Sequence, residues 1–181
     1  RRDFLKYSAA AVAVAGAFSM GLPTGAFAAE ATPKPGGILR LGLAGGSTTD
    51  SKDPGSWADT FTFVGFSAVY NTLTEIAVDG TAIPELAESW TSTPDARVWT
   101  FKLRQGVTFH NGKSLTADDV VASIQHHLGE KSTSAAKTVL GDVAKVSANG
   151  SDSVVFELHS GNADFSYVVA DYHLAILPSK D

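Results

Sequence analysis

Large apolar and polar side chains alternate along the residues from Arg97 to Arg104. Trp99, Phe101 and Leu103 fall on one face of this segment, and mostly polar residues fall on the other. A repeat of two residues is the pattern of a β-strand with one buried face. The segment is therefore predicted to be a half-buried strand, and its three large side chains are predicted to lie in the core.

A turn signal stands immediately before this strand. In Thr93-Pro94-Asp95-Ala96, proline presets its own φ angle and aspartate can accept a hydrogen bond from its own backbone. We therefore expect Ser89–Thr93 and Arg97–Leu103 to form a β-hairpin.

A second turn and a helix are expected after the strand. Asn111-Gly112 is the pair best able to take the positive φ angles of a tight two-residue turn. Thr116 precedes Asp119 by three residues, which is the spacing of a capping box at a helix start. The helix itself is indicated by an apolar stripe and by Gly129, which is expected to end it in a left-handed conformation. The stripe comprises Val120, Val121, Ile124 and Leu128.

Three runs of this region resemble a known signature. They read PELAESW from Pro84, WTFKLRQGVTFHNGK from Trp99 and LTADDV from Leu115. This order resembles the family 5 extracellular solute-binding proteins, which are the oligopeptide, dipeptide and nickel receptors of ABC importers. The resemblance extends from about Gly36 to Pro178 and is strongest at its centre.

The resemblance implies an α/β fold, specifically the N-terminal portion of a two-lobed periplasmic-binding-protein fold (class II, family 5 type) with a mixed sheet and flanking helices. Residues 29–60 would hold a leader, a first strand and a cleft loop of lobe I. Residues 61–181 would form the α/β subdomain of that lobe. Lobe II is expected to be missing from this chain, so the 181 residues alone are expected to show no measurable affinity for peptides.

The flanking segments carry weaker signals. A first strand is predicted over 37–43, a helix over 60–73, a hairpin over 74–78 and 81–83 around Asp79-Gly80, and a further hairpin over 143–148 and 153–158. Short helices are predicted over 132–140 and 163–170, and a last strand over 173–177.

The first 28 residues are interpreted as an export signal. Arg1, Arg2, Phe4, Leu5 and Lys6 resemble the twin-arginine consensus, and no charged residue occurs from Tyr7 to Ala29. Ala26-Phe27-Ala28 has the small-x-small pattern of a signal-peptidase site, with cleavage before Ala29. An uncleaved membrane anchor is the alternative, but several glycines and a proline disfavour a permanent helix. We therefore expect a periplasmic protein.

Charge and cysteine content exclude several classes of partner and site. The chain carries a net charge of −5, and removal of residues 1–28 would leave 11 basic and 18 acidic side chains, a net charge of −7. That balance disfavours nucleic acid and anionic membranes as partners. The absence of cysteine excludes disulfides and thiolate metal sites. We expect a monomer that needs no cofactor.

The candidate ligand-binding residues lie in the loop after the first predicted strand. They are Ser47, Thr48, Thr49, Asp50 and Trp57. The resemblance places this loop, which leads to Asp53-Pro54, at the ligand cleft. A solvated connector with Trp57 filling a local gap is the alternative, whereas a phosphate-binding loop is disfavoured because the Lys-Ser/Thr of a P-loop is absent.

No catalytic or metal-binding motif is apparent. The sequence contains no Gly-x-Ser-x-Gly elbow. His126 and His127 are adjacent on the predicted helix, whereas helical metal pairs need a spacing of four. The protein is therefore expected not to be an enzyme.

By resemblance, it would capture di- or oligopeptides between two lobes and deliver them to a membrane permease. A receptor for nickel, a metal chelate or another small solute remains the alternative, and an envelope hydrolase is a weaker one.

Overall fold

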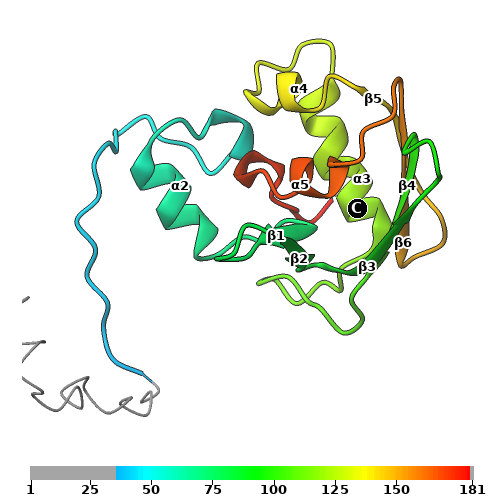
Figure 1. Ribbon diagram of the computed structural model, residues 1–181. Helices are drawn as coiled ribbons and strands as arrows, with labels where there is room; N and C mark the ends of the chain where they lie inside the picture. The colour runs from blue at the N-terminus through cyan, green and yellow to red at the C-terminus, as the bar shows by residue number, and fades with distance from the viewer. Residues whose placement is uncertain (1–35, 180–181) are drawn as a thin grey trace, which may run out of the picture. The chain divides into compact units, whose positions relative to one another are not determined.

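The computed structural model describes residues 36–179 (Figure 1). These residues fall into two units, one ending at Leu41 and the other beginning at Gly42. Residues 36–41 form no strand, and Ile38 and Leu39 are exposed to solvent. The predicted strand over 37–43 is therefore wrong. A strand requires backbone hydrogen bonds to a neighbour, and no strand among residues 36–179 pairs with this segment.

The larger unit is built on a four-stranded antiparallel sheet. Its strands are β3 (Ala87–Ser92), β4 (Val98–Leu103), β5 (Val143–Ala148) and β6 (Ser153–Leu158), in the spatial order β3-β4-β6-β5. The two hairpins predicted for these strands, β3–β4 and β5–β6, are confirmed. In the central pair, Trp99 lies opposite Phe156 and Phe101 opposite Val154. The α/β class is confirmed, and every strand pairing among the described residues is antiparallel.

The core lies on one face of this sheet. Trp99, Phe101 and Leu103 are buried while the intervening residues of β4 are half-buried, as the alternation predicted. Helix α3 (Ala117–Leu128) packs against β5 and β6 (Figure 1). Its Val120 and Ile124 are fully buried in the same cluster. Burial of this continuous apolar face holds the helix on the sheet.

The capping box at the start of α3 is confirmed, because Thr116 and Asp119 each accept from the other's backbone N–H. The two predicted glycine geometries need correction. Gly129 follows the helix with φ −51° and ψ 145°, so it does not take a left-handed conformation. At the Asn111-Gly112 turn only Gly112 has a positive φ, of 85°. The turn closes through the Phe109 N–H, which donates to the Lys113 carbonyl, so it is longer than a two-residue turn.

The remaining elements are short. They are η2 (Pro54–Ser56), α2 (Thr60–Ser67), β1 (Thr74–Ile76), β2 (Ala82–Pro84), α4 (Ala136–Val139), α5 (Phe165–Val168) and η3 (Tyr172–Leu174). The β1–β2 hairpin is confirmed, and α5 packs against β1. The helix predicted over 60–73 stops at Ser67, where the N–H groups of Val69 and Tyr70 both bond to the Phe66 carbonyl in a closing turn.

The strand predicted over 173–177 is also wrong. The Asp171 side chain accepts from the His173 N–H and starts the single turn of η3. The N–H of Ile176 then bonds to the Asn71 carbonyl in a non-strand segment. Leu174 and Ile176 are buried, so their apolar character serves tertiary packing without strand pairing.

Candidate functional site

The segment that follows Asp53-Pro54 is anchored by an aromatic cluster. The Trp57 ring is almost completely buried, stacks on Phe66 at 4.9 Å between ring centroids and lies 5.6 Å from Tyr70. Its indole Nε1–H donates to the Ser51 carbonyl at 3.2 Å. The segment ends at α2, where Asp59 forms a capping box with Thr62. Trp57 is therefore fixed at both its ring and its polar tip.

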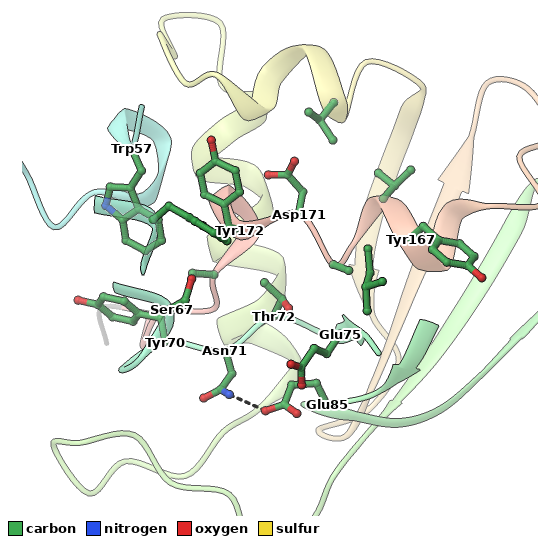
Figure 2. A pocket seen from close by; sticks show the side chains of 16 residues that line it. Trp57, Ser67, Tyr70, Asn71, Thr72, Glu75, Glu85, Tyr167, Asp171 and Tyr172 are labelled. Carbon is green, nitrogen blue, oxygen red and sulfur yellow. Dashed lines mark hydrogen bonds between the residues drawn. The ribbon is translucent and has the colours of Figure 1, made fainter. Parts of the chain in front are cut away.

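Trp57 also lines an open cavity of about 580 Å³ (Figure 2). The wall combines five aromatic side chains with three carboxylates, and none of the residues that line it is a lysine or an arginine. The aromatic residues are Trp57, Phe63, Tyr70, Tyr167 and Tyr172, and the acidic residues are Glu75, Glu85 and Asp171. A pocket with apolar walls and a few polar groups has the composition of a small-molecule site, and this one carries negative charge.

The polar groups of the cavity come from separate elements. Figure 2 shows the Asn71 amide directed at Glu85, to which it donates a hydrogen bond. Glu75 lies beside Glu85 in the same view, because β1 carries the first and the segment after β2 carries the second. Asp171 projects from the opposite side, just before η3. The β1–β2 hairpin and the η3 turn thus place these carboxylates around one space.

The structure separates the predicted ligand-binding residues. Ser47–Asp50 form an exposed turn in which the Ser47 N–H donates to the Asp50 carboxylate at 2.6 Å and the Ser47 hydroxyl meets Thr49 Oγ1 at 2.9 Å. None of Ser47, Thr48, Thr49 and Asp50 lines the cavity, whereas Trp57 does. A ligand-binding role for these five residues stays a prediction. Tyr70, which lies in the segment predicted to be helical, also contributes to the cavity wall.

The export-signal residues lie outside the described part of the chain. They are Arg1, Arg2, Phe4, Leu5, Lys6, Ala26, Ala28 and Ala29. Their role and the twin-arginine route therefore stay predictions.

Two neighbouring histidines of α3 connect the helix to the loops beside it. His126 Nε2 lies 2.9 Å from Asp53 Oδ1, and His127 Nδ1 lies 2.7 Å from the Ser134 hydroxyl. Burial alone would raise the pKa of Asp53, but hydrogen bonds from His126 and the Gly55 N–H lower it overall. As expected for adjacent helical residues, the two rings face different partners. His126 thus ties α3 to the segment at Asp53, and His127 ties it to the segment at Ser134.

Burial, together with the neighbouring charge of His126, lowers the pKa of His127 from 6.5 to about 4. Below pH 6.5 the unfolded chain takes up a proton that the folded chain resists until about pH 4. Stability is therefore expected to fall as the pH falls through this window, by up to about 1.4 kcal/mol per pH unit. Urea denaturation between pH 7 and pH 4.5 measures this slope.

The variant H127Q isolates the contribution of His127, and H159Q, at an exposed position, is the matched control. H127Q should flatten the dependence of unfolding free energy on pH, and H159Q should leave it as in the wild type. Equal slopes in wild type and H127Q would contradict the assignment.

Residues 36–179 contain neither a membrane-spanning helix nor a cluster of metal-binding side chains. No helix in this range has the length and apolar character needed to cross a bilayer. Within the same range, no group of three or more His, Cys, Asp or Glu side chains is arranged to hold a metal ion.

Residues 81–181 match the family model described as "Bacterial extracellular solute-binding proteins, family 5 Middle". The chain is 40% identical over 84 residues to di/tripeptide-binding protein 2 of Pseudomonas aeruginosa, covering 42% of this chain and 16% of that protein. It is 31% identical over 99 residues to the nickel-binding periplasmic protein of Escherichia coli, covering 55% and 19%.

Among solved structures, the chain is similar to the PBP AgaA in complex with agropinic acid from A. tumefaciens R10. The TM-score is 0.66 at 29% identity, covering 70% of this chain and 26% of that one. The chain thus spans less than a third of the length of each of these proteins.

Proposed function

Because the chain belongs to family 5 of the bacterial extracellular solute-binding proteins, we propose that it is part of the periplasmic receptor of an ABC importer that captures di- or oligopeptides. The observation that carries this proposal is the family match over residues 81–181, which contains β3, β4 and the capped α3. A peptide is proposed as the solute because the relative quoted at 40% identity is named a di/tripeptide-binding protein.

In this proposal the protein is a monomer that closes around its solute by hinge motion and presents the closed form to the permease. Selectivity arises from the difference in solute affinity between the closed and the open state. The sheet and α3 serve as the rigid scaffold, since their side chains are occupied with core packing. The open, negatively charged cavity at Trp57 supplies the concave surface that a solute-binding site needs.

Calorimetric titration of the complete gene product tests the solute class. A dipeptide, a tripeptide, a nickel chelate and heme are titrated separately, and then the peptide is titrated in the presence of the chelate. We expect one peptide bound per protein and no displacement by the chelate. Binding of the chelate without binding of either peptide would reject the peptide proposal in favour of the metal-chelate alternative.

A hydrolase is the second candidate, because Ser134 and His127 form a hydrogen-bonded hydroxyl–imidazole pair. Two features make this pair structural. The Ser134 hydroxyl oxygen accepts the Ala136 N–H at 3.1 Å, and His127 is almost completely buried. Incubation with a model ester or peptide is therefore expected to show no turnover above buffer. Turnover that S134A abolished would establish the enzyme instead.

A further inference from the structure

The imidazole of His173 contacts two hydrogen-bond acceptors, one of which is 116 residues away in the chain. Its Nδ1 lies 2.7 Å from Asp171 Oδ1, and its Nε2 lies 2.8 Å from the backbone carbonyl oxygen of Trp57. The residue is 7% exposed, so water does not compete freely for either nitrogen. His173 thus ties η3 to the tryptophan that forms part of the cavity wall.

Both partners of the ring accept hydrogen bonds. A carbonyl oxygen has no proton to donate, and a carboxylate is an acceptor on both oxygens. Asp171 Oδ1 also accepts the His173 backbone N–H at 2.9 Å, which favours the ionised carboxylate. A neutral imidazole carries one N–H, so it can satisfy only one of these contacts. The geometry requires two N–H donors, and only the imidazolium has them.

A third contact is independent of the hydrogen bonds. The ring of Tyr172 lies 3.9 Å from the His173 ring, centroid to centroid, at an interplanar angle of 32°. An aromatic face at this distance attracts a cation. A carboxylate on one edge, a carbonyl on the other and an aromatic ring on the face all favour the same positively charged state.

We infer that His173 is held as an imidazolium and is a positioning residue that fixes Trp57 in the wall of the cavity. When the ring loses its proton, an unprotonated nitrogen must face either the carboxylate or the carbonyl, and one bond is lost. The retained attachments of Trp57 are its indole bond to Ser51 and its stacking on Phe66. The remaining N–H stays with the charged carboxylate of Asp171, which is the stronger acceptor, so the Trp57 carbonyl loses its bond to η3 and the cavity wall loosens.

The other titratable groups around this link are few and close. Asp171 precedes the ring on its own turn, and Tyr172 lies against it. On the side of α3, the charges of His173 and Asp171 act on the pKa of His127 in opposite directions. The His126–Asp53 pair lies next to His127. Loss of the positive charge of His173 is therefore expected to loosen Trp57, and the Asp53 carboxylate stays ionised because its pKa is lowered.

The charge state is tested by NMR of the chain labelled with ¹⁵N-histidine. At pH 7 the His173 ring is expected to show a proton on both nitrogens, and His127 on one. The variant H173Q identifies the signals, and H159Q is the matched control at an exposed histidine. If H173Q does not fold, D171N serves, because the amide is uncharged and its NH2 group can donate to the ring nitrogen. The ring then needs only one N–H, and His173 should become neutral. A single ring proton on His173 in the wild type at pH 7 would overturn the inference.

The positioning role is tested by the Trp57 indole N–H signal, identified with W57F. Raising the pH until His173 is neutral should shift this signal in the wild type and in H159Q, and H173Q should show the shifted position at pH 7. An indole signal that is indifferent to both changes would reject the positioning role even if the imidazolium were present.

Only the consequence for solute binding rests on the proposed function. In the complete protein, H173Q should weaken binding of the best peptide several-fold, and H159Q should not. If no peptide binds the wild type, the proposed function fails while the two NMR results on His173 still decide this inference.

Discussion

Replacement of Asp119 by alanine is expected to lower the free energy of unfolding by about 3–5 kcal/mol, because it removes the buried acceptor of four hydrogen bonds and the ion-pair partner of Lys113. Asp119 is fully buried. Its Oδ1 accepts the Ser179 N–H at 2.7 Å and the Ser179 hydroxyl at 2.9 Å, and lies 3.1 Å from Lys113 Nζ. Its Oδ2 accepts the Thr116 N–H at 2.9 Å and the Thr116 hydroxyl at 2.8 Å. One carboxylate therefore joins the start of α3 to two other segments.

The neighbouring Asp118 is the matched control for this change. It lies in the same first turn of α3 but is exposed, so D118A loses only a favourable charge near the helix N-terminus, worth about 0.3–1 kcal/mol. D119N keeps the shape while removing the charge, and it should fall between the two. Urea denaturation of the four proteins gives the comparison. Equal losses for D118A and D119A would contradict the central role of Asp119.

The pH dependence of the wild type provides a second measurement of the same carboxylate. Burial alone would raise the pKa of Asp119, but hydrogen bonds from Ser179, Thr116 and Lys113 outweigh it and lower the pKa to about 2. The folded chain therefore holds the ionised form more strongly than the unfolded chain, whose carboxyl titrates near 3.8. The resulting stability is present above pH 3.8 and is lost as the pH falls toward 2. D119N should lack this loss.

The sequence predicted best those features that depend on neighbouring residues. The alternation around Phe101 and the three-residue spacing from Thr116 to Asp119 were both confirmed. Each is fixed by local geometry, namely the two-residue pleat of a strand and the first turn of a helix. What the spacing did not reveal is the second oxygen of Asp119, which binds Ser179 sixty residues away.

The sequence failed where a distant contact decided the structure. The sequence favours a continuous helix over 60–73, but the helix ends at Ser67, and the half-buried rings of Phe66 and Tyr70 pack against Trp57. Aromatic rings can stack on one another whether or not the residues that carry them belong to one continuous helix, so the spacing alone did not fix the end of the helix.

The cavity could not be predicted for the same reason. Its wall brings together residues from 57 to 85 and from 139 to 175, and no local pattern encodes that meeting. Among the predicted ligand-binding residues, Trp57 alone lines this cavity. The alternative, that Trp57 fills a local gap, also agrees with its burial.

Replacement of Phe101 by alanine is the second change with a large expected effect, a loss of about 3–5 kcal/mol in the free energy of unfolding. The Phe101 ring is fully buried in β4 and lies 5.6 Å from Phe156, 6.1 Å from Trp90 and 6.3 Å from Phe165 between centroids. Strands β3 and β6 hold Trp90 and Phe156, and α5 holds Phe165, so these neighbours cannot collapse fully into the space left by the ring. The remaining cavity adds to the lost burial.

Phe61 on α2 is the matched control, since its side chain is 44% exposed. F61A should change the unfolding free energy by only about 0.5 kcal/mol, and F101L should destabilise less than F101A because it leaves a smaller void. Denaturation by urea measures all three. If F61A and F101A lost the same stability, the β4 face could not be the centre of the core.

The same variant separates the scaffold from the solute site. Phe101 does not line the cavity at Trp57. In the complete protein, folded F101A should therefore keep the solute affinity of the wild type. W57A should lose both stability and solute affinity, because its ring is both a core contact and part of the cavity wall. Titrations under conditions in which each variant is at least mostly folded distinguish the two. An equal loss of affinity in F101A would mean that the sheet itself, and not the cavity at its side, meets the solute.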